Sequence, residues 1–201
     1  MDAGRLNERV FVLKFQGDGA DYAWGLGSER WARAEETGKN NPFSRAGLSA
    51  PSASFCLRRC EVTLHSAIRW KGRHYFLTAI RDIDRMYADI TAARVELTPC
   101  KVWRGETRTN PDTKRTERLP PEVKYTFPGV LTEKYLGYRQ LEPMAQLEET
   151  FVLVTPKAIQ LEVADLVEAG GEKYAVQVCH ILDEYKNEYE ITRKSSGAGE
   201  E

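Results

Sequence analysis

The stretch that decides the fold is IRWKGRHYFLTAIRDID, residues 68–84. It reads as two short strands joined by a tight turn, because Gly72 can take the positive φ of a hairpin turn without steric cost. After the turn, Tyr75 and Leu77 point to one face of the strand and Phe76 to the other. Both faces are apolar or aromatic, so we expect this strand to be covered on both sides.

The same pattern returns later in the chain. Residues 61–84 align without a gap on residues 160–183, with Gly72 on Gly171 and Tyr75 on Tyr174. The alternative is that any two antiparallel hairpins look alike, because the identities are few. We interpret the pattern as two copies of one small β-unit, and it predicts that the two tyrosines occupy equivalent places.

The sequence predicts an all-β fold with two small β-barrel-like units in tandem, long loops and little helix. The expected organisation is a first barrel over residues 1–100, a basic connector over 101–121, a second unit over 122–194 and a disordered tail over 195–201. Apolar and charged contents are those of a globular protein. Residues 29–35 are expected to form a strand with Trp31 pointing inward.

Charge is balanced overall but not along the chain. Residues 1–120 carry 21 Lys and Arg against 15 Asp and Glu, whereas residues 121–201 carry 8 against 15. Such polarity favours a molecule whose two ends face different partners. No apolar run approaches the roughly 20 residues of a membrane helix, so we expect no membrane partner. The N-terminus has no hydrophobic segment of the kind that a secretory signal carries.

The residue types that carry catalysis do not gather into a known signature. Asp82 and Asp84 share a face of an extended strand, which suits a metal or an acid/base pair, but such a pair is more typical of a solvated strand end. The four cysteines lack the spacing of a zinc site and favour reduced thiols in a cytosolic protein. We therefore expect no enzyme activity, no cofactor and no metal. The scattered side chains are the histidines His65, His74 and His180 and the cysteines Cys56, Cys60, Cys100 and Cys179.

Two polar segments stand out between the predicted strands. Residues 38–54 (GKNNPFSRAGLSAPSAS) have few side chains to bury, and a loop this long in a small domain is usually functional or disordered. Residues 101–121 carry six basic and three acidic residues with three prolines, which predicts a projecting linker or exposed hairpin. We expect its cations to contact a neighbouring subunit or DNA: Lys101, Arg104, Arg108, Lys114, Arg115 and Arg118. Replacement of Arg104, Arg108, Lys114 and Arg115 by alanine is expected to leave the fold intact and to impair assembly.

The first hundred residues resemble the head–tail joining proteins of tailed bacteriophages, also called head-closure or stopper proteins. The family pattern begins with Gly-x-Leu-x-x-Arg-hydrophobic, here Gly4 to Val10, and continues with a Trp-Ala strand. A Thr-hydrophobic-Arg strand, a Tyr-x-Gly-Arg-x-Tyr turn and an Asp-x-Asp end follow. In this chain these motifs are Trp31-Ala32, Cys56-Leu57-Arg58, Trp70-Lys71-Gly72-Arg73-His74-Tyr75 and Asp82-Ile83-Asp84. Trp70 replaces the usual Tyr, and residues 121–201 depart from the single-domain family.

The resemblance implies a small β-barrel in a homo-oligomeric ring of 12 or 6 subunits in the neck of the virion, assembled in the host bacterial cytoplasm. It implies a portal or adaptor protein on the head side, a tail-terminator or tail protein on the other, and packaged double-stranded DNA in the channel. It also implies that the long loop hangs into the channel and helps to retain the DNA. The residues concerned are Lys39, Asn40, Asn41, Pro42, Phe43, Ser44, Arg45 and Leu48.

A second hypothesis stays open from the residues themselves. Basic pairs and runs such as Arg58-Arg59 and Arg69/Lys71/Arg73 surround aromatic residues, and nucleic-acid modules built on β-barrels combine these features. Such a module needs an exposed aromatic platform for bases. The alternative function is therefore a non-enzymatic tandem β-barrel that binds nucleic acid.

Overall fold

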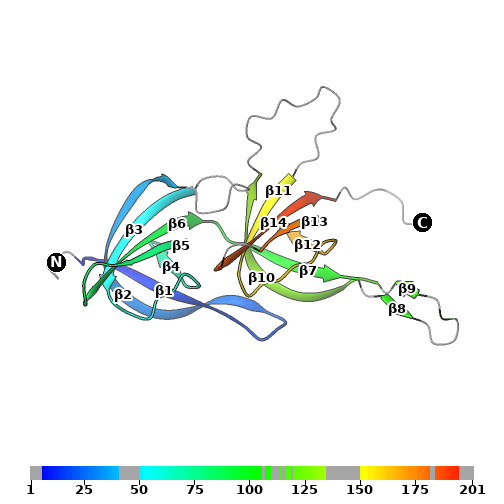
Figure 1. The fold of residues 1–201 in the computed structure, drawn as a ribbon, viewed down its shortest axis with the longest axis horizontal. Helices are drawn as coiled ribbons and strands as arrows, with labels where there is room; N and C mark the ends of the chain where they lie inside the picture. The colour runs from blue at the N-terminus through cyan, green and yellow to red at the C-terminus, as the bar shows by residue number, and fades with distance from the viewer. Residues whose placement is uncertain are drawn as a thin grey trace, which may run out of the picture.

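The computed structural model describes residues 6–40, 50–105, 107–109, 114, 116–118, 120–134, 150–181 and 184–194. These residues form strands, turns and loops, which confirms the all-β expectation. The described part of the chain contains no helix that could cross a membrane. Two barrels lie one after the other along the long axis of the molecule (Figure 1).

The first barrel is a closed ring of six antiparallel strands. Its strands pair in the order β1-β2-β3-β6-β5-β4, and β4 pairs back to β1. Closure gives every strand a neighbour on both sides, so the barrel has no edge strand of the kind at which sheets aggregate. The strands are β1 (Glu8–Gly17), β2 (Tyr22–Asn40), β3 (Ala50–Arg58), β4 (Ala67–Trp70), β5 (Arg73–Asp82) and β6 (Tyr87–Val95).

The second barrel repeats this topology strand for strand. Its order β7-β10-β11-β14-β13-β12 closes in the same way, so the prediction of two barrel-like units in tandem is confirmed. Its strands are β7 (Thr98–Arg104), β10 (Glu122–Glu133), β11 (Thr150–Pro156), β12 (Leu166–Ala169), β13 (Glu172–His180) and β14 (Lys186–Arg193).

A small hairpin interrupts the second barrel. Strands β8 (Thr107–Thr109) and β9 (Thr116–Arg118) form a separate two-stranded sheet between β7 and β10. Figure 1 shows this hairpin projecting from the end of the second barrel away from the first. The projecting segment is therefore shorter than residues 101–121, because Lys101 to Arg104 lie in β7 and close the barrel.

The organising hairpin occurs twice with the same pairing. Ile68 lies opposite Tyr75 in the first barrel, and Val167 lies opposite Tyr174 in the second. Both tyrosines are buried in the core of their own barrel. The prediction that they occupy equivalent places is confirmed.

The equivalence extends to the turns and irregularities of these hairpins. Both central residues of each turn have positive φ, at 49° and 75° for Lys71 and Gly72 and at 61° and 87° for Gly170 and Gly171. Such turns match the right-handed twist of the flanking strands. The pairing of β5 with β6 shifts register after Leu77, and the pairing of β13 with β14 shifts after the equivalent residue, Val176.

Each barrel has its own core, and a third apolar cluster joins the two. In the first barrel the rings of Phe55, Trp70 and Tyr75 pack at centroid distances of 5.4–6.0 Å. The expectation for Trp31 was wrong: its side chain is on the outer surface, because the neighbouring Ala32 takes the interior position.

The joining cluster comes from the outer faces of both barrels. Leu13, Ala67, Phe76 and Val95 of the first pack against Val130, Val152 and Val154 of the second, so residues 75–77 are covered on both faces as expected, whereas Ala79 further along the strand is exposed. Polar contacts flank the cluster: the Thr126 amide donates to the Ala20 carbonyl at 2.8 Å, and Lys186 Nζ donates to the Leu77 carbonyl at 2.8 Å. The barrels are therefore packed against each other through apolar and polar contacts.

Candidate functional site

The predicted channel loop begins at the end of a long strand. Lys39 and Asn40 lie in β2, where their backbones pair with Pro51 and Ala50 of β3. Nearer the barrel along the same two strands, the hydroxyl oxygens of Thr37 in β2 and Ser52 in β3 are 2.9 Å apart. The other predicted residues of the loop lie outside the described part of the chain, so their role stays a prediction: Asn41, Pro42, Phe43, Ser44, Arg45 and Leu48.

The second barrel has a long connection at the equivalent position. Strands β10 and β11 correspond to β2 and β3, and residues 135–149 connect them. The loop or short helix expected at residues 141–149 lies outside the described residues. The topology thus places residues 41–49 and residues 135–149 at the same site of each barrel.

The predicted basic connector divides into two parts. Lys101 lies in β7, with its Nζ 3.6 Å from Glu168 Oε1. Arg108 and Arg118 lie in the β8–β9 hairpin. Lys114 is exposed with φ of 53°, and Arg115 lies outside the described residues. Arg108 and Arg118 therefore lie on the projecting β8–β9 hairpin, whereas Lys101 and Arg104 lie in the barrel strand β7.

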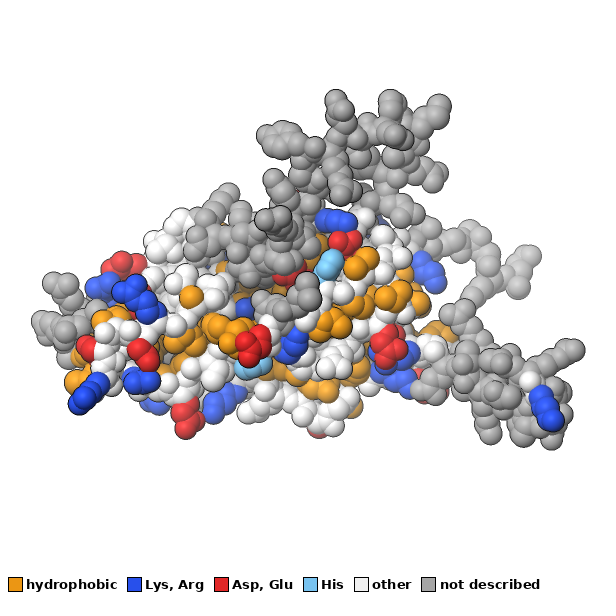
Figure 2. All heavy atoms as spheres, in the orientation of Figure 1, with side chains coloured by type: hydrophobic (Ala, Val, Ile, Leu, Met, Phe, Trp, Pro, Cys, Tyr) orange, Lys and Arg blue, Asp and Glu red, His pale blue; other side chains and the backbone are white. Residues whose placement is uncertain are grey.

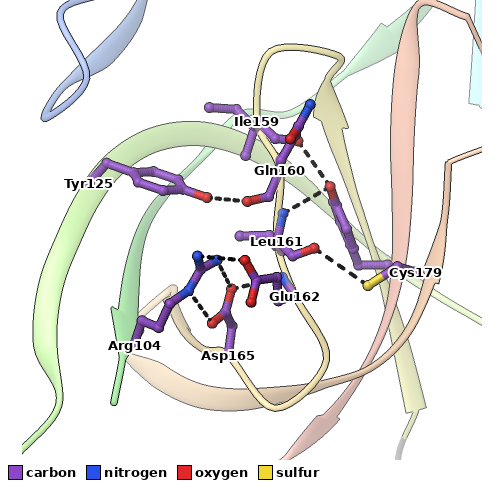
Figure 3. A network of polar contacts seen from close by, with 9 residues as sticks. Arg104, Tyr125, Ile159, Gln160, Leu161, Glu162, Asp165 and Cys179 are labelled. Atoms are coloured by element: carbon purple, nitrogen blue, oxygen red, sulfur yellow. Dashed lines mark hydrogen bonds and ion pairs between the residues drawn. The ribbon is translucent and has the colours of Figure 1, made fainter. Parts of the chain in front are cut away.

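Arg104 forms a bidentate ion pair rather than an exposed contact surface (Figure 3). Its Nε and Nη2 atoms donate to the two carboxylate oxygens of Asp165 at 2.8 and 2.6 Å, and its Nη1 donates to Glu162 Oε1 at 2.8 Å. Asp165 is only 4% exposed. Hydrogen bonding to Asp165 raises the pKa of Arg104 above its ordinary value. This ion pair predicts that replacing Arg104 harms the fold, contrary to the expectation from the sequence, since removal would strand a buried carboxylate.

The same network holds the loop between β11 and β12 (Figure 3). The Tyr125 hydroxyl donates to the Gln160 carbonyl at 2.6 Å, and the Cys179 thiol donates to the Leu161 carbonyl at 3.5 Å. The Tyr189 hydroxyl donates to the Ile159 carbonyl at 2.9 Å. Burial raises the pKa of Tyr125 to about 12, so its phenol stays protonated. These contacts hold the loop in place against β10, β13 and β14.

The acidic pair at residues 82 and 84 has two separate structural contacts. Asp82 accepts a hydrogen bond from Arg59 at 2.9 Å. Asp84 accepts from the amides of Met86 and Tyr87 at 2.7 and 2.8 Å, which shapes the turn between β5 and β6. None of the four cysteines forms a disulfide, and the described residues contain no group of three or more potential metal-ligating side chains.

Sequence reasoning missed a pocket that both barrels build. The cavity measures about 620 Å³ and lies beside the joining cluster. Its walls come from the loop before β4 in the first barrel and from the segments after β11 and before β14 in the second. No local sequence signal marks it, because the residues meet only when the barrels dock. Its lining includes Lys14, Phe15, Trp24, Leu64, Phe76 and Tyr185.

A second surface feature lies on the outer wall of the first barrel. Trp31 is 52% exposed, and the Arg9 guanidinium lies 5.0 Å from its ring centroid. Arg30 and Arg58 border the same shallow depression. On the face seen in Figure 2, acidic and basic side chains are interspersed over both barrels. The Trp31 surface therefore combines an exposed aromatic ring with several cations.

Comparison with protein-family models, curated proteins and solved structures finds no significant match to this chain.

Proposed function

We propose that this chain is a structural component of the tailed-phage neck. As a head–tail connector or head-closure protein, it would join the portal or adaptor of the DNA-filled capsid to the tail and help to retain the DNA. The proposed assembly is a ring of 12 or 6 copies, with a tail-terminator or tail protein on its other side. The proposal assigns the chain no catalytic step.

The observation that carries this proposal is where the resembling motifs fall. Trp31-Ala32 lies in β2, Cys56-Leu57-Arg58 ends β3, and the Trp70–Tyr75 motif spans the β4–β5 turn. All of them belong to one closed barrel, the fold class that the resemblance implies. A barrel with no open edge is well suited to a rigid connecting part.

The position of the long connections supports a gating role. The β2–β3 and β10–β11 connections occupy equivalent sites of the two barrels, so each copy in a ring would supply two such segments. Loops converging on a channel could retain DNA through many weak contacts and still open when the tail docks.

The decisive experiment shortens the first of these connections in the phage. Because Asn40 and Ala50 pair across β2 and β3, residues 41–49 can be replaced by a short glycine turn without loss of strand pairing. We expect normal folding and ring formation, but heads that lose DNA before tails attach, measured as the ratio of full to empty heads. Full, infectious particles would refute the gating role. A matched shortening of residues 135–149 reports whether the second connection shares it.

The projecting hairpin offers a separate test of subunit contact. The triple variant Arg108→Ala, Lys114→Ala and Arg118→Ala keeps the Arg104 ion pair intact. We expect a normal circular dichroism spectrum and melting temperature together with a reduced yield of assembled particles. Unchanged particle yield would remove the hairpin from the proposed contacts.

The exposed Trp31 favours one alternative, a tandem barrel that binds single-stranded nucleic acid. An aromatic ring flanked by Arg9 and Arg58 is a stacking platform, and base stacking contributes about 1–3 kcal/mol per base. Fluorescence anisotropy with an oligothymidylate tests it. Binding that weakens steeply with salt and is lost in Trp31→Ala would favour this function over the neck role.

A further inference from the structure

One wall of the pocket between the barrels is the loop before β4. This loop is the first barrel's equivalent of the loop before β12, which the Arg104 ion pair holds in the second barrel. Leu13 and Ala67 form the last pair of the β1–β4 ladder, and Trp103 and Leu166 form the last pair of the β7–β12 ladder. One residue further along each ladder, Lys14 takes the place of Arg104, and Ser66 takes the place of Asp165.

The backbone of the two loops is the same. The Ser66 amide donates to the Thr63 carbonyl at 2.8 Å, and the Asp165 amide donates to the Glu162 carbonyl at 3.1 Å. In return, the side chains of Ser66 and Asp165 accept from the amides of Thr63 and Glu162 at 3.3 and 2.8 Å. The first barrel thus has the same turn and a cation, Lys14, at the position of Arg104, but it has no carboxylate at the position of Asp165.

The pocket carries more positive than negative charge. Lys14, Lys157 and Lys186 line it, and among the described residues its acidic lining residue is Glu61. The Glu61 side chain is 95% exposed and lies 3.8 Å from Lys14 Nζ. A pair this exposed is weak, so a better-placed carboxylate can replace it.

The floor of the pocket is apolar and aromatic. Phe15, Trp24, Phe76 and Tyr185 contribute rings, and the whole cavity of about 620 Å³ has room for more than one side chain. The indole Nε1 of Trp24 is buried and has no hydrogen-bond partner among the described residues. A site of this kind selects a group with an apolar body and an anionic end.

We propose that this pocket binds a peptide segment of a partner protein, in which an Asp or Glu carboxylate lies beside an apolar side chain. The carboxylate meets Lys14 and takes the place that Asp165 fills in the second barrel, while the apolar side chain packs on the aromatic floor. Charge complementarity and the matching internal ion pair identify this occupant. The inference holds whether or not the chain belongs to a phage neck.

A peptide pair tests the site on the full chain labelled with ¹⁵N. The probes are acetyl-Gly-Leu-Glu-Phe-Gly-amide and its Gln counterpart, titrated while the indole N–H signal of Trp24 is followed by NMR. We expect a saturable shift with the Glu peptide and roughly tenfold weaker binding of the Gln peptide, as the loss of one charge-assisted hydrogen bond predicts. Sodium octanoate is the small-molecule comparison.

Three variants separate the site from general charge effects. Lys14→Ala should lower the affinity for the Glu peptide roughly tenfold. Ser66→Asp should lower it by a similar factor, because the new internal carboxylate would pair with Lys14 in place of the peptide. Lys71→Ala is the matched control, because it removes an equally exposed lysine from the same barrel, with 60% side-chain exposure against 57% for Lys14. It should bind like the unmodified chain.

Several outcomes would overturn the proposal. These are equal binding of the Glu and Gln peptides, an equal loss in Lys71→Ala and Lys14→Ala, and unaltered binding in Ser66→Asp. Saturation by octanoate without any response to the Glu peptide would replace the peptide partner with a small amphipathic acid. Circular dichroism of each variant confirms that the fold is retained before binding is compared.

Discussion

The two barrels share one topology but stabilise the same loop differently. In the second barrel the loop before β12 is closed by Arg104 and the nearly buried Asp165. In the first, the equivalent residues are Lys14 and Ser66, and a pocket lies there instead. A duplicated fold therefore needs the backbone turn in both copies, whereas the ion pair is a property of one copy alone.

The largest expected effect comes from weakening the joining cluster, so that the two barrels unfold independently. Phe76 is 2% exposed in the joining cluster, so Phe76→Ala should lower the free energy of unfolding by about 3–5 kcal/mol. Because the cluster couples the barrels, we expect calorimetry to show two transitions in place of one. Val163→Ala, at a side chain that is 62% exposed, is the control. A single transition shifted downward would mean that the barrels unfold together without this ring.

The next effect tests the loop difference directly. Asp165→Ala leaves Arg104 without its main partner and should cost about 3 kcal/mol in urea unfolding. Ser66→Ala, the matched change in the first barrel, removes one weak neutral hydrogen bond and should cost less than about 1 kcal/mol. Equal costs for the two variants would show that the ion pair adds nothing to the second barrel.

The last effect develops only as the pH falls. His74 lies at the position of Lys173 in the second barrel, and burial, with a contribution from the charge of Arg69, lowers the pKa of His74 to about 4. An unfolded histidine titrates near pH 6.5, so the unfolded chain binds more protons between pH 6.5 and 4. The contribution of His74 leaves the free energy of unfolding undiminished above about pH 6.5. It should lower that free energy by up to about 3 kcal/mol as the pH drops toward 4.

The variant His74→Phe checks this assignment. A phenyl ring fits among Trp24 and Phe76, which lie 5.2 and 5.5 Å from the imidazole centroid. Urea midpoints measured from pH 7 to pH 4 should fall less steeply in the variant than in the unmodified chain. Parallel slopes would assign the acid sensitivity to other groups.

The sequence was sufficient to predict the hairpins and their repetition. Alternation around Tyr75 and the glycine in each turn specify a local pairing that tertiary contacts did not change. The alternation around Trp31 was misread, because an indole next to a small residue was assigned to the interior. In the structure, the interior position next to it holds Ala32.

The features that sequence reasoning missed depend on residues far apart in the chain. Arg104 was counted among the cations of a polar segment, although its partner Asp165 lies 61 residues later. The joining cluster and the pocket beside it combine strands from both barrels, and no periodicity within one strand predicts such a contact. The channel loop, in contrast, was assigned from its composition and its resemblance, and its role awaits the deletion experiment.

The joining cluster also determines how far the repetition can extend. The strand registers make Arg33, Ser54 and Cys56 of the first barrel the equivalents of Val130, Val152 and Val154. A further barrel docking by the same contact would meet a guanidinium and a hydroxyl where the existing contact offers valines. The outer face of the first barrel therefore does not offer the valine contact of the joining cluster, so copies of the chain do not extend end to end into an open fibre through that contact. Any higher assembly must use other surfaces.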